Sequence, residues 1–337
     1  MDTLLLTAEQ TDKAGEILAH GGIVAIPTET VYGLAASVYD TNAIENVFKA
    51  KGRPQDNPLI VHISSLEQLT SVAKNIPPEA YELAKRFWPG PLTMILDKQD
   101  SISDTVTAGF STVAVRFPSH ETALRIISAA NVPLAAPSAN LSGSPSPTEA
   151  GHVYADLNGR IDAIVDGGSC SVGVESTIVS LFERPFRLLR PGGITLEQLQ
   201  SVLGEVVVDR AVTAKLSENE KVRAPGMKYR HYAPKAPVRA VKGSGRDTAE
   251  YIRSRITEKT AVICYREYAD EFSNCYVYVY GDETAKDELA RNLFSVLRET
   301  DAACPDIIYI QCPDDSGIGL AVANRIKKAA GFDITEL

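Results

Sequence analysis

The sequence predicts an α/β protein of two unequal domains, and three observations lead to this fold class. The chain has 337 residues, enough for two ordinary domains. Short apolar, β-branched runs alternate with segments of helical periodicity from residue 7 to about 209, and again from 238 onward. Between them the periodicity stops. We therefore predict domains at 1–209 and 238–337, joined by a linker at 210–237.

In the first domain the predicted elements alternate along the chain. Thr7 and Gln10 have the spacing of a capping box and predict a helix that Gly21 and Gly22 close, followed by a buried strand at 22–26. Asp40 begins a helix that ends at Lys51. Further strands are predicted at 58–63, 111–117, 132–136, 162–166, 176–181, 186–190 and 204–209, with helices near 65–75, 78–88, 119–130 and 195–203. Fully apolar runs beside alternating ones indicate a mixed sheet of seven or more strands with flanking helices.

The linker is basic in an otherwise acidic protein. From residue 221 to 246 there are eight Lys or Arg and no Asp or Glu, although the net charge of the chain is −9. A solvated spacer is one interpretation of such a charge run. Tyr229, His231 and Tyr232 are interleaved with the cations, which a plain spacer does not need. The segment therefore also qualifies as part of a binding site.

The second domain repeats the α/β alternation on a smaller scale. Strands are predicted at 238–241, 260–265, 275–280 and 307–311, with helices near 247–258, 283–299 and 318–330, so a small Rossmann-like domain is expected. Its GSG at 243–245 lacks the third glycine of the dinucleotide fingerprint. Nucleotide binding is not predicted there.

Composition excludes several classes of protein. The five cysteines are scattered and contain no C-x-x-C pair, which argues against a disulfide framework and against a zinc site. No run approaches 18 apolar residues, and the first ten residues do not resemble a signal peptide. We therefore expect a soluble, cytoplasmic protein with no membrane segment. The sequence does not identify ligands for a metal ion.

Polar groups recur at the predicted ends of the first domain's strands, where open α/β sheets bind ligands. PTET follows the strand at 22–26, PSANLSGSPS follows 132–136, and GVES precedes 176–181. Lys51 and Arg53 lie two positions apart in a loop. Each feature alone has a structural explanation: Arg116 as a surface ion-pair residue, His62 as a core histidine, the serines as turn residues. Their joint occurrence favours an anion-binding site.

These motifs resemble one family. PTETVYGLAA, KGRPQDNPL, PSANLSG, GVESTIV and LLRPGGIT occur in the order found in the YrdC-type domain of threonylcarbamoyl-AMP synthases, and APGMKYRHYAPKAP with the second domain resembles the long, two-domain form. The resemblance covers essentially the whole chain. It implies a YrdC-type twisted mixed sheet in the first domain.

The resemblance also implies a reaction. L-Threonine, bicarbonate and ATP, with Mg²⁺, would give threonylcarbamoyl-adenylate and pyrophosphate. The product would pass to a complex that transfers the threonylcarbamoyl group to adenosine 37 of tRNAs reading ANN codons. Because negative charge gathers with no covalent intermediate, positioning and electrostatic stabilisation would carry the catalysis.

The family's residue roles transfer to matching positions of this sequence. The implied ATP contacts are Arg53, Asn57, Thr112, Ser138, Ser146, Arg190, Arg230, His231 and Tyr232. The implied threonine pocket is Thr30, His62, Arg116, Ala136 and Ser176, with Arg116 facing the carboxylate. The implied catalytic set is Lys51, Arg53, Ser138 and Asn140. No metal ligand is implied, because Mg²⁺ usually bridges phosphates and needs few protein ligands.

Two alternatives remain at this point. A YrdC-like module that binds RNA without synthase activity is disfavoured by the acidic net charge, while the basic linker favours it. A hydrogenase maturation factor that uses carbamoyl phosphate ranks third, since the chain lacks the paired cysteines of a zinc segment. Direct, stable tRNA binding is left undecided.

Overall fold

The computed structural model describes residues 2–214 and 232–337. Contacts divide the chain into two compact units: the first comprises Met1–Ser142, Pro147–Ser171 and Glu175–Lys228, and the second Gly143–Ser146, Val172–Val174 and Tyr229–Leu337. Most of the predicted linker lies outside the described residues, so the predicted domain boundaries stay a prediction. Two short segments of the first 200 residues belong to the second unit, which no sequence periodicity indicated.

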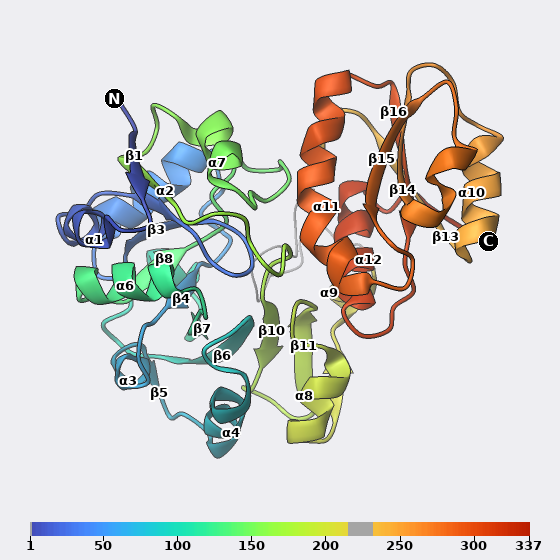
Figure 1. The fold of residues 1–337 in the computed structure, drawn as a ribbon. Helices are drawn as coiled ribbons and strands as arrows, with labels where there is room; N and C mark the ends of the chain where they lie inside the picture. Colours follow the sequence, from blue (N-terminus) through green and yellow to red (C-terminus); the bar gives the residue numbers. More distant parts are fainter. Residues whose placement is uncertain (1, 215–231) are drawn as a thin grey trace. The chain divides into compact units, whose positions relative to one another are not determined.

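The first unit contains a large mixed sheet (Figure 1). It has 12 strands, in the order β1-β9-β2-β3-β8-β4-β7-β6-β10-β11-β12, with β5 paired to β6. The strands are β1 Leu4–Thr7, β2 Val24–Ile26, β3 Gly33–Ser37, β4 Ile60–His62, β5 Ala73–Lys74, β6 Leu92–Lys98, β7 Thr112–Arg116, β8 Leu134–Ala136, β9 Ala163–Asp166, β10 Thr177–Ser180, β11 Phe186–Arg190 and β12 Val206–Val208. The predicted mixed sheet is confirmed.

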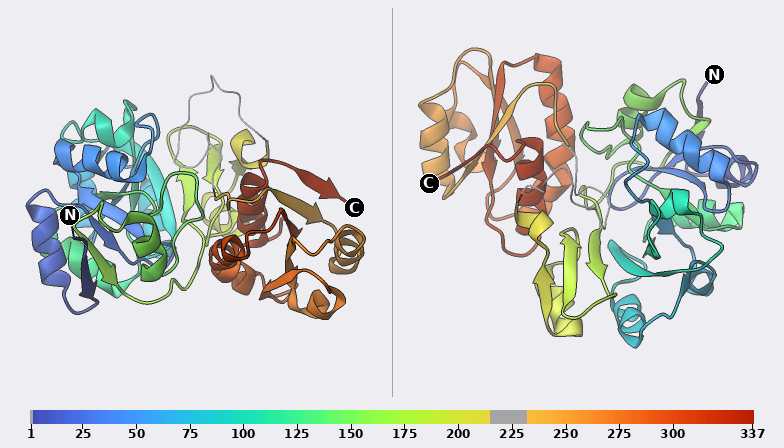
Figure 2. Two further views of the ribbon diagram at one scale, coloured as in Figure 1. Left: turned by 90° about the horizontal axis from the view of Figure 1, so that it is seen from above. Right: turned by 180° about the vertical axis from the view of Figure 1, so that it is seen from behind.

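Helices flank this sheet, and α1 and α6 lie side by side over its first strands (Figures 1 and 2). Their apolar faces, including Leu18, Ile126 and Ile127, pack with Val24 and Leu134 in one buried core cluster. The helices of the first unit are α1 Thr11–Ala19, α2 Thr41–Lys51, α3 Glu67–Val72, α4 Pro78–Phe87, α5 Asp104–Thr107, α6 Glu121–Ala130, α7 Ala150–Leu157, α8 Leu196–Leu203 and α9 Arg210–Thr213. The flanking helices predicted from the sequence are therefore confirmed.

The predicted start of the first helix is wrong. Thr7 ends strand β1, and α1 begins only at Thr11 with Gln10 as its N-cap. The Gln10 side chain does accept the Thr7 N–H at 3.0 Å, but no side chain caps the helix. One of the two capping-box hydrogen bonds, from the Thr7 N–H to Gln10 Oε1, thus forms. It spans the turn between β1 and α1, because Thr7 is part of the edge strand β1.

The second unit is a parallel α/β fold. Its five strands run in the order β15-β14-β16-β13-β17, and every neighbouring pair is parallel. Helix α10 lies on one face of this sheet and α11 and α12 on the other (Figures 1 and 2). The elements are β13 Val238–Lys242, α10 Gly245–Arg253, β14 Thr260–Tyr265, the 3-10 helix Arg266–Glu271, β15 Tyr276–Gly281, α11 Lys286–Thr300, the 3-10 helix Asp301–Ala303, β16 Ile307–Cys312, α12 Gly319–Ala329 and β17 Ile334–Glu336. The predicted Rossmann-like domain is confirmed.

In the GSG segment of this unit, the helix N-terminus is hydrogen-bonded to a carboxylate of the same unit. The N–H of Gly245, the first residue of α10, donates to Glu283 Oε1 at 2.8 Å. Helix N-termini bind anions because their N–H groups lack backbone partners. Here a carboxylate of the same unit takes that position, which agrees with the absence of a full glycine fingerprint.

Candidate active site

Arg116 stands at the end of β7 and is buried, with only 4% of its side chain exposed. In the sheet register it lies opposite His62 of β4 on one side and Thr93 of β6 on the other. Its Nη1 donates to Thr30 Oγ1 at 2.9 Å, and its Nη2 lies 2.8 Å from Glu29 Oε1. The arginine is therefore held against the segment that follows β2.

That segment, residues 28–31, folds into a tight turn around one hydroxyl. Thr28 Oγ1 accepts the N–H groups of Thr30 and Val31 at 3.2 and 3.3 Å and donates to Val31 O at 2.6 Å. Threonine favours such local side-chain turns. The turn fixes the backbone that carries Glu29 and Thr30, so the two side chains are held at Arg116.

His62 is buried beside Arg116 and is neutral. Burial, and secondarily the charge of Arg116, lowers the pKa of His62 from 6.5 to about 3. Its Nδ1 lies 3.1 Å from Ile60 O, a contact that suits the neutral tautomer protonated at Nδ1. The histidine therefore adds shape and polarity to the site without a further positive charge.

Ser176 lies just before β10 and contacts side chains from two other strands, β6 and β11. Arg190 of β11 donates through Nε to Ser176 O at 2.9 Å and through Nη2 to Ser176 Oγ at 3.0 Å. The hydroxyls of Thr93 and Ser176 lie 2.7 Å apart. Because Thr93 is also the register partner of Arg116, these residues lie in one row across β7, β6, β10 and β11.

Lys51 hydrogen-bonds to the backbone of the PSAN segment, residues 137–140. It is the last residue of α2 and is 2% exposed. Its Nζ donates to Ser138 O and to Asn140 O, each at 2.5 Å, and Ser138 Oγ donates to Asn140 Oδ1 at 2.5 Å. The segment after β8 is thereby held by a buried cation, in addition to backbone hydrogen bonds such as the one from the Ala139 N–H to Tyr32 O at 2.8 Å.

Arg53 and Asn57 lie in the loop that follows α2. Arg53 is half-buried and its Nη2 lies 3.5 Å from Pro58 O. Asn57 is 1% exposed, and its Oδ1 has no hydrogen-bond partner among residues 2–214 and 232–337. A buried acceptor without a donor is costly, so it marks a position where a ligand donor would be stabilising.

The remaining predicted site residues fall in different places. Thr112 begins β7, half-buried and two residues before Ala114 on the face of Arg116, and Ala136 ends β8 as a buried residue paired with Ile60. Ser146 and Tyr232 are buried residues of the second unit, where the Tyr232 ring packs on Phe294 with centroids 5.0 Å apart. Arg230 and His231 lie outside the described residues. The structure thus joins Thr30, His62, Arg116, Ser176 and Arg190 in one group, and Lys51, Ser138 and Asn140 in another.

Two residues of this arrangement were not predicted. Glu29 is 5% exposed and forms the ion pair with Arg116. Its signal was present, since a carboxylate sits between the two threonines of PTET directly after a buried strand. Thr93 lies on β6, a strand that the prediction omitted, so nothing in the sequence pointed to it.

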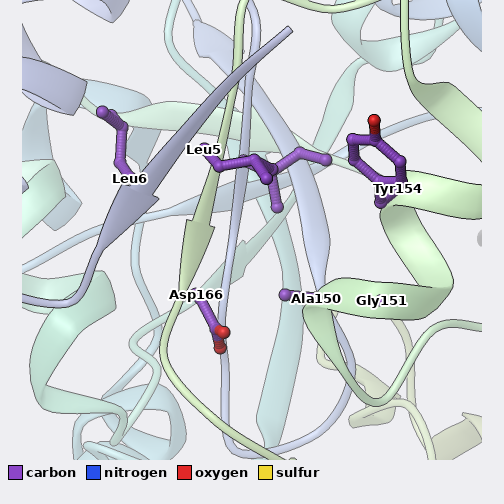
Figure 3. Close-up of a pocket in the computed structure, with 7 residues that line it drawn as sticks. Leu5, Leu6, Ala150, Gly151, Tyr154 and Asp166 are labelled. Carbon is purple, nitrogen blue, oxygen red and sulfur yellow. The ribbon is translucent and has the colours of Figure 1, made fainter.

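A separate pocket lies near the sheet edge and is distinct from these residues (Figure 3). Its volume is about 230 Å³, and it is lined by Leu5, Leu6, Ala150, Gly151, Tyr154, Ile164 and Asp166. Ligand pockets usually combine a larger volume with converging polar groups. None of the predicted site residues lines it.

No metal cage accompanies the site: within the described part of the chain, no group of three or more His, Cys, Asp or Glu side chains could hold a metal ion. Within the same residues, no helix is both long and apolar enough to cross a membrane.

Comparisons with known proteins agree with this architecture. Residues 16–192 match the family model described as "Telomere recombination", and residues 194–331 match the one described as "Threonylcarbamoyl-AMP synthase, C-terminal domain". Together with the buried cations and hydroxyls at the strand ends, these matches define an enzyme of the nucleotidyltransferase type.

Relatives then specify the family. Threonylcarbamoyl-AMP synthase of Pyrococcus abyssi is 48% identical over 331 residues, which is 96% of this chain and 95% of the relative. The enzyme of the same name from Bacillus subtilis is 46% identical over 98% of this chain and 95% of the relative. The crystal structure of P. abyssi Sua5 complexed with L-threonine has a TM-score of 0.93 and 46% identity, and the match covers 100% of both chains. The chain belongs to the threonylcarbamoyl-AMP synthase family, and the predicted resemblance is confirmed.

Proposed function

We propose that the protein condenses L-threonine, bicarbonate and ATP into threonylcarbamoyl-adenylate and pyrophosphate. The observation that supports this most directly is the buried line from Thr30 through Arg116 and Ser176 to Arg190. It combines two guanidinium groups with hydroxyls, all on buried residues. A family member of the same fold binds L-threonine in its crystal structure.

In the proposed reaction Arg116 holds the carboxylate of threonine. The neutral amine attacks the carbon of bicarbonate, forming a C–N bond and releasing water, so that a carbamate results. A carbamate oxygen then attacks the α-phosphorus of ATP, and the bond to pyrophosphate breaks. Neither step needs a covalent enzyme intermediate, so orientation and charge stabilisation supply the catalysis.

The ATP side of the site would use the second group of residues. Arg53 offers a fork of donors to phosphate oxygens, and Arg190 lies next to the threonine group, where the two substrates must meet. Asn57 supplies a buried acceptor. Lys51 and Asn140 would keep the segment around Ser138 in place, and Thr112, Ser146, Arg230, His231 and Tyr232 complete the proposed contacts. Mg²⁺ would enter together with ATP as the MgATP substrate and would reduce the negative charge of its phosphates.

The proposed cellular role follows from the product. A mixed anhydride of a carbamate and AMP is a reactive acyl donor, suited to transfer onto tRNA adenosine 37 by a separate complex. We place the enzyme in the cytoplasm, in keeping with five cysteines that form no disulfide. Family membership favours the synthase over the RNA-binding module and over a carbamoyl-phosphate enzyme.

Pyrophosphate release tests the proposal. The full chain is incubated with ATP and Mg²⁺, with and without L-threonine plus bicarbonate, and the nucleotide product is identified by mass spectrometry. The proposal expects release that requires both co-substrates and a product with the mass of threonylcarbamoyl-AMP. Release that is independent of threonine would reject it, and a salt-sensitive tRNA complex would then support the RNA-binding alternative.

A further inference from the structure

The ion pair between Glu29 and Arg116 is buried but only partly hydrogen-bonded. The two side chains are 7% and 4% exposed, and Glu29 Oε1 lies 2.8 Å from Arg116 Nη2. In the part of the chain that the structure describes, both carboxylate oxygens and the Nε and Nη2 of Arg116 lack a hydrogen-bond partner. The charges are therefore close, but they are not aligned as a hydrogen bond.

Such an arrangement is unfavourable for a purely structural ion pair. Removing two charges from water is compensated only when their remaining donors and acceptors are satisfied. Here Arg116 keeps donors available and Glu29 keeps acceptors available. An α-amino acid zwitterion presents the opposite pattern, a carboxylate that accepts and an ammonium that donates, on adjacent atoms.

We propose that Glu29 binds the α-ammonium group of the amino-acid substrate, while Arg116 binds its carboxylate. The ammonium gives one proton to the Glu29 carboxylate before the neutral amine attacks bicarbonate. This inference rests on the proposed function and adds a substrate-contacting residue to it. Glu29 thereby makes the site specific for α-amino acids over carboxylic acids that lack the amine. Arg116 alone would not distinguish the two, because both carry a carboxylate.

The other titratable groups near Glu29 leave this role open to a ligand. Burial lowers the pKa of His120, so its ring is neutral, and the His120 Nδ1 has no hydrogen-bond partner within residues 2–214 and 232–337. Burial raises the pKa of the Cys170 thiol to about 12, so it is also neutral. Arg116 is then the cation in contact with Glu29, and it still has donors to give to a substrate carboxylate.

Binding of two ligands by calorimetry tests the proposal. L-Threonine is compared with 3-hydroxybutanoate, which keeps the carboxylate and hydroxyl but lacks the amine, on the full chain and on Glu29→Gln. Loss of a charge-assisted contact should weaken L-threonine binding by about 10- to 100-fold. The affinity for 3-hydroxybutanoate should stay within about twofold or rise, since the amine is the only substrate group that Glu29 contacts and the loss of its charge leaves Arg116 less neutralised for the ligand carboxylate.

Several outcomes would overturn the inference. An equal loss for both ligands would make Glu29 a structural partner of Arg116, and an unchanged affinity for L-threonine would give it no role in binding. Wild-type protein that binds both ligands equally would also contradict it. If 3-hydroxybutanoate binds too weakly to measure, Glu29→Asp decides, because a retained carboxylate should recover at least part of the lost L-threonine affinity.

Controls separate this inference from the proposed function. Thermal melting of each variant shows whether the first unit still folds. A wild-type chain that binds L-threonine while Glu29→Gln binds it equally well rejects only the role of Glu29. A wild-type chain that binds no L-threonine rejects the proposed function, and the inference with it.

Discussion

Replacing Lys51 with Met separates a structural brace from a simple phosphate ligand. The Nζ of Lys51 donates to two backbone carbonyls, Ser138 O and Asn140 O, at 2.5 Å each. Methionine keeps the length of the side chain but removes both donors. Each hydrogen bond from a charged group contributes about 1.5–3 kcal/mol, and relief of the buried charge offsets part of the loss. We expect the free energy of unfolding of the first unit to fall by about 2–4 kcal/mol.

The chain offers a specific probe and a matched control for this measurement. Its single tryptophan, Trp88, lies in the first unit and is 9% exposed, with its indole N–H bonded to Leu92 O at 2.7 Å. Trp88 fluorescence during urea denaturation therefore follows the first unit rather than the second. Lys49→Met is the control, because Lys49 lies on the same helix but is exposed, and its ion pair with Glu45, at 3.7 Å, is a surface contact.

A brace and a ligand give opposite results. If Lys51 holds the segment around Ser138, Lys51→Met unfolds at clearly lower urea than Lys49→Met. If Lys51 served only to bind phosphate, the Lys51→Met variant measured without ATP would be as stable as the wild type or more stable, because a buried charge has been removed. A difference between the two variants below about 0.5 kcal/mol would refute the structural argument.

Three further predictions use the same assays. Arg53→Ala should reduce pyrophosphate release by about 100-fold with little change in melting temperature, since Arg53 is half-buried in a loop; near-normal turnover would contradict its role. Ser176→Ala removes the hydroxyl that contacts Thr93 and Arg190 and should raise the KM for threonine by about tenfold, whereas an unchanged KM would show that this contact does not shape the pocket. Burial lowers the pKa of His62 from 6.5 to about 3 in the folded protein. Between these pH values the unfolded state therefore binds more protons than the folded state. The contribution of the neutral ring to stability is complete above about pH 6.5 and is lost as the pH falls. His62→Asn should flatten the decline of the urea midpoint between pH 6.5 and 4.5, where the wild type loses up to about 1.4 kcal/mol per pH unit; parallel pH profiles would contradict the buried neutral ring.

The first domain shows why some strands could be predicted and others could not. Strands such as β7 and β11 are apolar, β-branched or alternating, and their periodicity identifies them. Strand β3, Gly33–Ser37, consists largely of small residues with low strand propensity, and it forms because β2 and β8 pair with it on either side. Strand β6 was also omitted, although it pairs with β7 and β10. Tertiary pairing, rather than local preference, places β3.

The site residues divide along the same line. Motif resemblance predicted Arg116 and Ser176, but it did not predict what they contact. Arg116 and Thr30 are 86 residues apart in the chain, and Thr93 and Ser176 are 83 apart. Contacts at such separations follow from strand order and register, which no local pattern of the sequence determines. Glu29 stands in PTET directly after a buried strand, which could have marked it as a candidate, but its pairing with Arg116 follows only from the position of β7.

The arrangement of these contacts suits a reaction that depends on positioning. The side chains of Arg116, Thr93 and Arg190 stand on paired strands, whose ladder hydrogen bonds fix them before any ligand arrives. The segment around Ser138 is not a strand; it has a single β-bridge to Gly33, and Lys51, 87 residues away in the chain, adds hydrogen bonds to its carbonyls. A misplacement of even about 1 Å is costly to rate when no covalent intermediate holds the substrates. Substitution of Thr93 or Lys51 should therefore affect turnover even where neither side chain contacts a substrate.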